Sequence, residues 1–497
     1  MQGCRADFTM TTPTQLVSWI GKLPAARILV IGDVMLDRYV FGTVSRISPE
    51  APIPVLHTSR TYSTLGGAGN VARNLDALGA RTHLIGVVGN DPAATEIGAI
   101  LAGLGSTTTS LVAEAGRTTV TKTRFLTGQQ QMLRVDAETA SGEDPETLQK
   151  IRSHVSEHLR SCDAVLLSDY GKGTLGGDLP RWIIGLARES RKPVVVDPKG
   201  DDFDRYSGAS VITPNAQELR HASRLPVEGD AAIVAASRRI IDECGIQALL
   251  ATRSEKGMTL VEASGAVLHS RAEAREVYDV SGAGDTVIAV FAAALGAGAS
   301  MPEAAALANA AAGIVVGKQG TSVVSPSELG GALASRELSG ALRKVVDLPA
   351  AVSQVASWRE HGLRTGFTNG IFDLLHTGHL SLLRQAAARC DRLVVGLNGD
   401  RSVRALKGDA PPVQNEAARS AILGSLEMID MIVVFQDETP LGVIEALKPE
   451  VLIKGGNYRD DEVVGGELVR GYGGEVFRAE IVGDTSAGID SVTHGTF

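Results

Sequence analysis

Short apolar runs rich in β-branched residues recur along the first part of the chain. They occupy residues 27–33, 164–170, 193–198 and 209–215, and each is followed by glycine or polar residues and then by a helix-like stretch. Strands that alternate with helices in this way form a largely parallel sheet covered by helices. The pattern therefore predicts an α/β fold.

The pattern stops once and then starts again. Residues 329–362 carry Ser, Arg, Lys and Glu without a strand pattern, and a new α/β unit opens at Arg364. A chain of 497 residues has room for about three domains of ordinary size, or two if one is large. We therefore predict an N-terminal extension (1–24), a first domain (25–328), a linker (329–362) and a smaller second domain (363–497).

Composition limits the partners and the compartment. Hydrophobic residues make up 44% of the chain and charged residues 21%, so buried cores can form. The net charge of −9 argues against a nucleic-acid partner, which usually requires a basic surplus. The cysteines form no CxxC pair, which argues against a zinc ribbon or a disulfide framework and favours a reducing cytoplasm. They are Cys4, Cys162, Cys244 and Cys390.

Two segments bear on membranes, and neither favours one. The N-terminal stretch MQGCRADFTMTTP lacks the apolar region of a secretory signal. The longest run without charged residues lies between Asp285 and Glu303, is shorter than the ~20 residues that a membrane span needs, and is rich in Ala and Gly. We expect a buried helix there, no membrane partner and a cytoplasmic protein.

The sequence Gly282-Ala283-Gly284-Asp285 stands immediately before that apolar helix. Small residues let backbone N–H groups approach an anion, and a helix N-terminus adds partial positive charge. Asp285 is then placed to accept the proton of a hydroxyl group during phosphoryl transfer. The alternative is a turn with an aspartate that caps the helix.

Further polar groups follow the predicted strands of the first domain. Asp33 and Asp37 follow the first strand, and Gly66, Gly67 and Asn70 precede a helix, where carboxylate, backbone and amide groups can bind sugar hydroxyls. Asn215, Ala216, Gln217 and Glu218 follow a later strand and can organise ATP phosphates with Mg²⁺. Thr252, Arg253 and Gly257 follow another strand and can line the nucleotide site. Each position alone is equally compatible with a structural role.

Together, in this order, these motifs resemble the ribokinase-type carbohydrate kinases over about residues 25–325. The resemblance implies Asp285 as the catalytic base, residues 282–284 as the anion hole and residues 215–218 for nucleotide and metal organisation. Asp33, Gly67 and Asn70 would contact the sugar. It also implies a β-lid over Phe41 to Leu65, which in such kinases often builds a homodimer.

The second domain carries a different motif, with two histidines in Phe372-Asp-Leu-Leu-His376-Thr-Gly-His379. His376 and His379 are three residues apart and share one helical face at a helix start, where N–H groups meet phosphate. The chemistry implied is attack of a phosphate oxygen on the α-phosphorus of ATP, with release of pyrophosphate. A zinc pair or ordinary helix-start histidines are the alternatives, although no third Cys or His ligand stands nearby.

This HxGH motif resembles the cytidylyltransferase-like superfamily. The resemblance implies nucleotide contacts in the stretch that contains Asn369, Gly370 and Phe372. Cationic side chains can neutralise the phosphates, or they can be surface charges. The candidates are Lys407, Arg419 and Lys454.

The two modules in this order resemble the bifunctional D-glycero-β-D-manno-heptose 7-phosphate kinase and heptose 1-phosphate adenylyltransferase family over about residues 25–490. The resemblance implies a ribokinase-like three-layer α/β domain with a β-lid, followed by a smaller Rossmann-like nucleotidyltransferase domain. It implies phosphorylation of the anomeric oxygen and then adenylyl transfer, with ATP and Mg²⁺, for lipopolysaccharide synthesis. The stretch that begins at Asn309 belongs to the same resemblance, and we include Asn309 among the nucleotide-binding candidates.

The 7-phosphate requires cationic contacts. Candidates near the sugar side are Arg46, Lys122, Arg124, Arg134 and Lys172, and the sequence does not rank them.

Two residues and one short segment depart from the family pattern in the second domain. Asn457 replaces an aspartate, Pro411 an arginine, and residues 485–487 read Thr-Ser-Ala. Two alternatives therefore stay open. One is a kinase with a degenerate second module, and the other is the same pair of reactions on another sugar phosphate. A non-enzymatic nucleotide sensor would require Asp285 to be idle.

Overall fold

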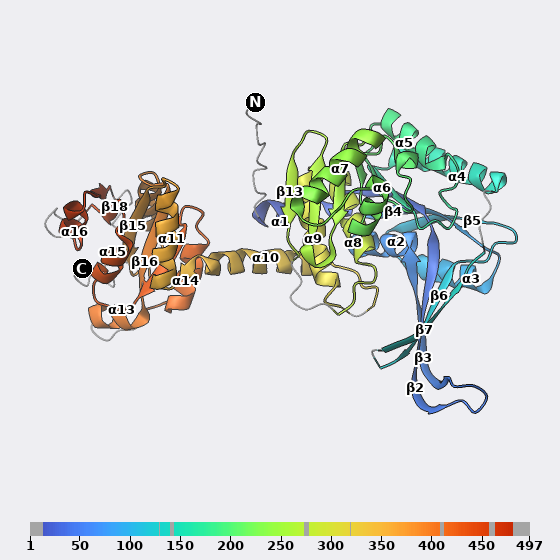
Figure 1. Ribbon diagram of the computed structural model, residues 1–497, viewed down its shortest axis with the longest axis horizontal. Coiled ribbons are helices and arrows are strands. Elements are labelled where there is room, and N and C mark those ends of the chain that lie inside the picture. The colour runs from blue at the N-terminus through green and yellow to red at the C-terminus, as the bar shows by residue number, and fades with distance from the viewer. Residues whose placement is uncertain are drawn as a thin grey trace. The chain divides into compact units, whose positions relative to one another are not determined.

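The computed structural model describes residues 13–128, 130–139, 144–272, 278–318, 320–407, 412–456 and 463–480. The chain divides into two compact units, Met1–Leu333 and Ala334–Phe497. Figure 1 shows that helices cover both faces of a sheet in each unit. Among the described residues, no helix combines the length and the apolar character that crossing a bilayer requires.

The first unit is built on a nine-stranded sheet with the order β13-β12-β11-β10-β9-β8-β1-β4-β5. The seven strands from β5 to β11 run parallel, and β12 and β13 are antiparallel additions at one edge. The strands are β1 (Arg27–Gly32), β4 (Arg81–Val88), β5 (Thr107–Ala113), β8 (Ala164–Ser168), β9 (Val194–Asp197), β10 (Val211–Ile212), β11 (Ala248–Thr252), β12 (Met258–Glu262) and β13 (Val267–Ser270).

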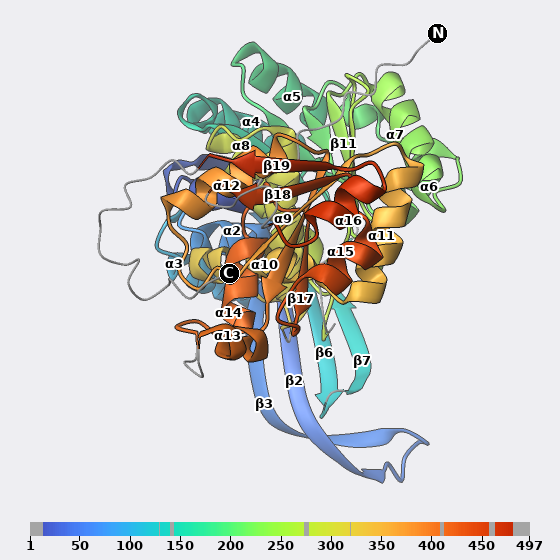
Figure 2. The same cartoon turned by 90° about the vertical axis from the view of Figure 1, so that its left-hand side faces the viewer.

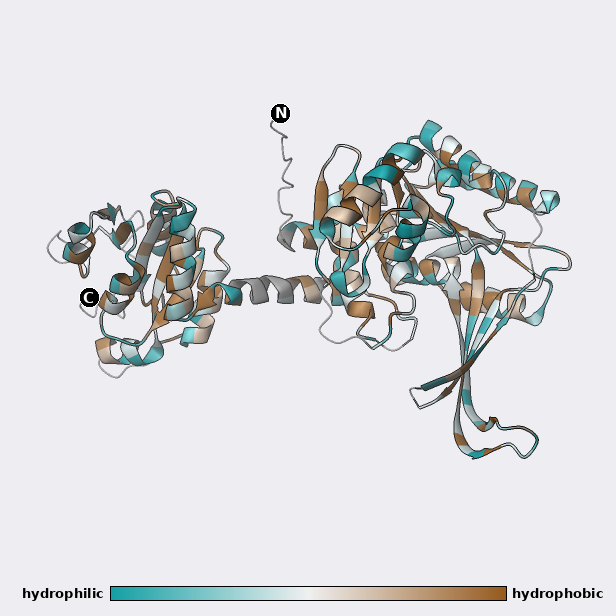
Figure 3. Cartoon of the chain, in the orientation of Figure 1, coloured by the Kyte–Doolittle hydropathy of each residue, from teal (hydrophilic) through white to brown (hydrophobic). Residues whose placement is uncertain are grey.

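Ten helices accompany this sheet in the described part of the chain. They are α1 (Pro13–Ile20), α2 (Ala68–Ala77), α3 (Pro92–Ala102), α4 (Pro145–His158), α5 (Leu179–Glu189), α6 (Ala216–Ser223), α7 (Asp230–Cys244), α8 (Ala283–Gly296), α9 (Met301–Val315) and α10 (Pro326–Arg343), the last of which contains the boundary between the units. Figure 3 shows hydrophilic and hydrophobic residues alternating along the outer helices α4 and α5, as expected of helices with one buried face.

Strand β1 explains why the apolar runs of the sequence are continuous. Ile28 and Val30 belong to the core on one face of the sheet, and Leu29 and Ile31 to the core on the other. A parallel strand covered by helices on both faces is buried on both sides, so it needs apolar residues at every position. The predicted three-layer α/β architecture is confirmed.

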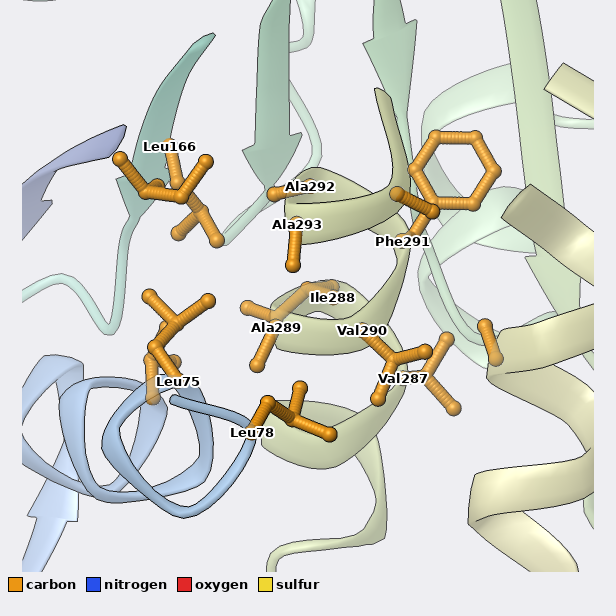
Figure 4. Close-up of a cluster of buried hydrophobic side chains, with 14 of the residues drawn as sticks. Leu75, Leu78, Leu166, Val287, Ile288, Ala289, Val290, Phe291, Ala292 and Ala293 are labelled. Atoms are coloured by element: carbon orange, nitrogen blue, oxygen red, sulfur yellow. The ribbon is translucent and has the colours of Figure 1, made fainter. Parts of the chain in front are cut away.

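Helix α8 is the apolar helix expected from the sequence. Every residue from Asp285 to Ala294 is buried. Figure 4 shows the side chains of α8 beside Leu75 and Leu78, and beside Leu166 of β8. Its many alanines let α2 and α9 pack closely on either side of it. Asp285 therefore stands at the start of a helix that is buried over its next nine residues.

A separate four-stranded sheet of order β3-β2-β6-β7 forms the lid of the first unit. Its strands are β2 (Val34–Ile47), β3 (Pro54–Gly67), β6 (Thr121–Thr127) and β7 (Gln130–Ala137). Figure 2 shows these strands projecting away from the helices of the unit, with the β2–β3 hairpin reaching furthest. The predicted lid at 41–65 therefore begins earlier, at Val34, and includes two strands that come later in the chain.

The second unit contains a six-stranded, fully parallel sheet of order β14-β17-β16-β15-β18-β19. Its strands are β14 (Val345–Val346), β15 (Thr365–Gly370), β16 (Arg392–Asn398), β17 (Met431–Phe435), β18 (Val451–Gly455) and β19 (Glu475–Ala479). Its helices in the described ranges are α11 (Leu348–Glu360), α12 (Thr377–Ala387), α13 (Asp400–Lys407), α14 (Glu416–Gly424), α15 (Leu441–Leu447) and α16 (Gly466–Gly471).

The expected linker and N-terminal extension carry more structure than their composition indicates. Strand β14 pairs with β17, and Ala351 and Val355 of α11 enter the core of the second unit. Leu16 and Ile20 of α1 likewise belong to the core of the first unit. Both segments are short amphipathic pieces whose burial depends on partners far away in sequence, so local composition gave no sign of it.

Candidate active sites

Several polar residues of the first unit lie at the carboxyl ends of its parallel strands. Asp33 follows β1, Tyr170 follows β8, Asp197 ends β9, and Asn215 follows β10. In open α/β sheets, ligands bind at this edge. The first candidate site therefore lies where Asp285, at the start of α8, meets these residues.

Gly282 is the N-cap of α8, and Asp285 lies in the first turn that follows it. Gly282 has a φ of +78°, and a Cβ there would lie 2.7 Å from Nδ2 of Asn70. Glycine is needed for both reasons. Ala283 and Gly284 begin the first turn, at the positive end of the helix dipole. The N–H of Ala283 donates to the carbonyl oxygen of Val280 at 3.2 Å, and the N–H of Gly284 is left without a helical partner. This arrangement suits an anion hole.

Both carboxylate oxygens of Asp285 accept a hydrogen bond. Nδ2 of Asn70 donates to Oδ2 at 2.8 Å, and the hydroxyl of Tyr170 donates to Oδ1 at 2.7 Å. Burial raises the pKa of Asp285 to about 6, the two hydrogen bonds oppose that rise, and the charge of Asp37 adds to it. A buried carboxylate poised near neutral pH is suited to accept a proton.

Asp33 supports a loop of this site, and its expected contact with the sugar stays a prediction. Its side chain is 1% exposed and accepts hydrogen bonds from the backbone N–H groups of Tyr170, Lys172 and Thr174. These three bonds hold the loop that brings Tyr170 to Asp285. The structure therefore assigns Asp33 to the support of this loop.

The other residues expected on the sugar side lie near one another. A Cβ at Gly66 would lie 2.4 Å from Oδ2 of Asp37, and one at Gly67, whose φ is +55°, would lie 2.4 Å from the carbonyl oxygen of Asp33. Asp37 is nearly buried and pairs with Arg124 at 2.6 Å. The close approach at both positions explains why glycines stand there.

Two predicted sugar-side cations are neutralised by neighbours. Nε of Arg134 lies 2.9 Å from Asp136 on the exposed strand β7. Nζ of Lys172 lies 2.6 Å from Glu138. Neither cation is paired with Asp285 or Asp37 in the part of the chain that the structure describes.

Residues 215–218 form the start of α6. Asn215 and Glu218 make a reciprocal capping box, and the second carboxylate oxygen of Glu218 accepts a hydrogen bond from Nζ of Lys199 at 3.2 Å. Ala216 and Gln217 occupy the first turn between them. Asn215 also pairs with Thr252 in an isolated parallel bridge, so the segments after β10 and at the end of β11 are adjacent.

The turn after β11 and the helix α9 supply the remaining nucleotide candidates. Arg253 bonds to Asp230 at 2.7 Å and to Thr259 at 3.1 Å, so its guanidinium is held by the protein. Gly257, with a φ of +83°, lies against the backbone of Ser270. Asn309 donates to the carbonyl oxygen of Arg271 at 2.9 Å. Gly257 therefore shapes the turn, and Asn309 fastens α9 to the segment after β13.

The carboxylates at this edge fit a magnesium ion carried by phosphates. No group of three or more potential protein ligands exists among the described residues. However, burial raises the pKa of Asp197 well above its ordinary value, and the charges of Asp285 and Glu218 add to that rise. Mg²⁺ is usually held by one or two carboxylates together with substrate phosphates and water. Asp197 and Glu218 can supply those carboxylates.

The second candidate site lies at the carboxyl end of β15. His376 is the N-cap of α12, and its Nδ1 accepts a hydrogen bond from the N–H of Gly378 at 3.2 Å. The rings of His376 and His379 stack, with centroids 3.9 Å apart. Burial lowers the pKa of His379 to about 4, and the neighbouring His376 contributes. His379 is therefore neutral at physiological pH and can give or accept a hydrogen bond.

The loop between β15 and α12 has an unusual backbone. Phe372 is buried and has a φ of +48°, a conformation that non-glycine residues rarely adopt. Its ring lies 5.1 Å from that of His379. A Cβ on Gly370 would lie 3.0 Å from the Phe372 ring, so glycine lets this ring fold back. Such backbone strain is concentrated at functional sites.

Lys454 and Asn369 meet at this edge although they are 85 residues apart. Nζ of Lys454 donates to the side-chain oxygen of Asn369 at 2.5 Å. Burial lowers the pKa of Lys454 to about 8. An anionic phosphate beside Lys454 would restore its charge, which supports its expected place in the nucleotide site.

The prediction for Arg419 is corrected by its burial. Its side chain has no exposed surface and bonds to the carbonyl oxygens of Ile371 and Asn398 and to Asp400. The guanidinium holds the loops together and has no surface left for a phosphate. Lys407 is the last residue of α13. Asn457, Pro411 and residues 485–487 lie outside the described residues.

Two residues of the first site were not chosen from the sequence. Tyr170 was visible only as an aromatic residue after a strand. Arg73 lies one helical turn after Asn70 and bonds to its side-chain oxygen at 3.3 Å and to the carbonyl oxygen of Thr321 at 3.4 Å. Burial lowers the pKa of Arg73, and its spacing of three from Asn70 was the available signal.

The fold and the two sites define a carbohydrate kinase joined to a nucleotidyltransferase. Residues 25–328 match the pfkB family of carbohydrate kinases, and residues 367–472 match the cytidylyltransferase-like family. The chain is 51% identical to the "Bifunctional protein HldE" of Rhodospirillum rubrum, with 94% of each chain covered. It is 50% identical to the protein of that name from Paramagnetospirillum magneticum, with 96% of this chain and 98% of the relative covered. The chain therefore belongs to the HldE family of bifunctional enzymes.

Solved structures support the fold of the first unit. Phosphofructokinase-2 from Escherichia coli, in complex with potassium, has a TM-score of 0.54 and 18% identity, covering 62% of this chain and 98% of that one. A carbohydrate kinase from Agrobacterium tumefaciens has a TM-score of 0.51 and 22% identity, covering 62% of this chain and 97% of that one. At these identities the likeness concerns the fold alone.

Proposed function

We propose that the first unit phosphorylates D-glycero-β-D-manno-heptose 7-phosphate at its anomeric oxygen. The single observation that carries the chemistry is the buried Asp285 carboxylate, held by Asn70 and Tyr170 at the N-terminus of α8. Asp285 takes the proton of the O1 hydroxyl as that oxygen attacks the γ-phosphorus of ATP. Membership in the HldE family supports the heptose as acceptor.

Other groups of the first unit stabilise the negative charge of the phosphates or hold the base in position. The N–H of Gly284 and the positive end of the α8 dipole receive the transferring phosphoryl group. Mg²⁺, when bound with ATP, neutralises phosphate charge, and Asp197 and Glu218 are the carboxylates available to hold it. Asp33 holds the loop that carries Tyr170, so that the Tyr170 hydroxyl can bond to the base.

We propose that the second unit transfers the adenylyl group of ATP to heptose 1-phosphate, giving ADP-heptose and pyrophosphate. The sugar phosphate attacks the α-phosphorus directly, so no covalent enzyme intermediate is needed. His379, which is neutral, and its neighbour His376 donate hydrogen bonds to the phosphates, and Lys454 supplies positive charge. A separate phosphatase would remove the 7-phosphate between the two reactions, and the ADP-heptose would serve lipopolysaccharide core synthesis in the cytoplasm.

A pair of single variants tests the assignment of both reactions. Asp285→Asn should remove turnover of heptose 7-phosphate, identified by NMR of the product, and leave pyrophosphate release from ATP and heptose 1-phosphate intact. His379→Ala should do the reverse. Loss of both reactions in either variant would contradict two separate sites. Absence of pyrophosphate release by the unaltered chain would show that its second unit is degenerate.

We also propose that the lid forms a homodimer. All residues of β7 are exposed, including the large hydrophobic residues Met132, Leu133 and Val135, and Ile47 and Ile53 are exposed on the β2–β3 hairpin. Exposed apolar residues on a projecting sheet favour a second copy as the partner. Light scattering of the full chain should give twice its mass, and Leu133→Glu should give the monomer.

A further inference from the structure

The acceptor proposed above already carries a phosphate, and the structure ranks the cations that can bind it. Five cations were candidates from the sequence. Arg124, Arg134 and Lys172 are paired with Asp37, Asp136 and Glu138, and Arg46 is exposed near the distal end of the β2–β3 hairpin. Lys122 has neither an ion pair nor a hydrogen bond to its Nζ within the described ranges.

Lys122 lies on β6, beside Asp37 of β2 in the parallel register. Its Nζ is 5.6 Å from the centre of the Tyr170 ring. The hydroxyl of the same ring donates to Asp285. Lys122 therefore lies over the face of the ring whose edge hydroxyl bonds to Asp285, close enough for its charge to lower the pKa of Asp285. A sugar whose reacting hydroxyl meets Asp285 can extend toward Lys122.

The surroundings of Lys122 favour an anion. The side chain is half-buried, and burial lowers its pKa. Arg124 and Lys172 lower that pKa further by repulsion, while Asp37 and Asp136 oppose the effect. A doubly charged phosphate would replace the water lost on burial and screen the three cations from one another.

Arg73 is the other half-buried cation near Asp285 for which no carboxylate partner is described, and its position differs. It bonds to Asn70, to the carbonyl oxygen of Thr321 and to Thr64. Thr321 and Asn70 are also the nearest neighbours of Gly282. Arg73 thus lies beside the anion hole, where the phosphoryl group is transferred, whereas Lys122 lies over Tyr170 on the lid side.

We propose that Lys122 binds the phosphate that the acceptor sugar carries and thereby selects a phosphorylated sugar. The inference rests on the proposed kinase function and adds the residue that sets its acceptor class. Lys122 touches the substrate away from the reacting atoms, so its loss should weaken acceptor binding and leave the base in place.

The test compares heptose 7-phosphate with unphosphorylated heptose as acceptors for the full chain. Lys122→Met should raise KM for heptose 7-phosphate about 10- to 100-fold, as expected for losing a charge-assisted hydrogen bond. KM for ATP and for unphosphorylated heptose should change less than about twofold, and Lys122→Arg should restore most of the preference. Lys150→Met, which removes an exposed charge on α4, is the matched control.

Other outcomes overturn the proposal. An unchanged preference for the phosphorylated sugar would show that another group binds that phosphate. A raised KM for ATP, or an equal fall in kcat with both acceptors, would place Lys122 at the γ-phosphate instead. Adenylyl transfer by Lys122→Met reports that the chain is folded. If the unaltered chain rejects heptose 7-phosphate but uses fructose 6-phosphate, the proposed function fails while the comparison of fructose 6-phosphate with fructose still tests Lys122.

Discussion

Replacing Tyr170 with Phe removes one hydrogen bond to Asp285, the proposed base, and almost nothing else. The Tyr170 hydroxyl donates to Oδ1 of Asp285 at 2.7 Å, and this bond stabilises the charged form of a base whose pKa is about 6. The aromatic ring, its contact with Lys122 and the loop held by Asp33 are retained. The variant therefore isolates how much the phenol contributes to keeping the base ionised.

The size and sign of the effect follow from the bond. A hydrogen bond to a charged group contributes roughly 1.5–3 kcal/mol, and one pKa unit corresponds to about 1.4 kcal/mol. Removing the bond disfavours the charged carboxylate, so the pKa of Asp285 should rise to between about 7 and 8. At pH 7 the ionised fraction should fall from about nine tenths to between about one half and one tenth.

The assay is the pH dependence of kcat/KM for heptose 7-phosphate, which reports the free enzyme. Because the base acts when deprotonated, activity rises with pH through its pKa and then levels. Tyr170→Phe should move this acid limb upward by about one to two pH units and recover most of its activity near pH 9. If the acid side of the kcat/KM profile does not shift and the activity is reduced equally at every pH, the reasoning is refuted.

Three further predictions concern other groups. Asp285→Asn should raise the free energy of unfolding of the first unit by about 3 kcal/mol at pH 8 and by much less at pH 4. The reason is that a carboxyl whose pKa is raised in the folded state destabilises the fold once it is charged. Thermal unfolding at both pH values checks this. Adenylyl transfer should decline above about pH 8 as Lys454 loses its proton, and Lys454→Arg should abolish that decline in a pH–rate profile. Arg419→Met should destabilise the second unit by about 3–5 kcal/mol in denaturant titrations, while kinase turnover persists.

The first and second predictions share one physical cause. Burial of Asp285 in a well-packed helix raises its pKa and costs stability, and the same burial gives a base that is active near neutral pH. An enzyme that gains stability on losing its base would show that the two effects come from one desolvated charge.

The sequence alone determined the two α/β units, the glycine-capped helix at Asp285 and the histidine pair at the start of α12. These features depend on local patterns: the spacing of apolar residues, the residues that helix ends require, and glycine where the backbone turns sharply. Asp285, His376 and His379 were therefore identified with their elements before any contact was known.

Tertiary structure alone decided which groups meet. Asn70 and Tyr170 reach Asp285 from 215 and 115 residues away, and Arg419 bonds to loops 21 and 48 residues distant. The ion pairs of the fold also distinguish the candidate phosphate-binding cations. Arg124 and Lys172 have carboxylate partners, whereas Lys122 has none in the described structure. A residue's type and spacing fix its local conformation, but its charge state and its partners depend on burial and on surfaces brought together by the fold.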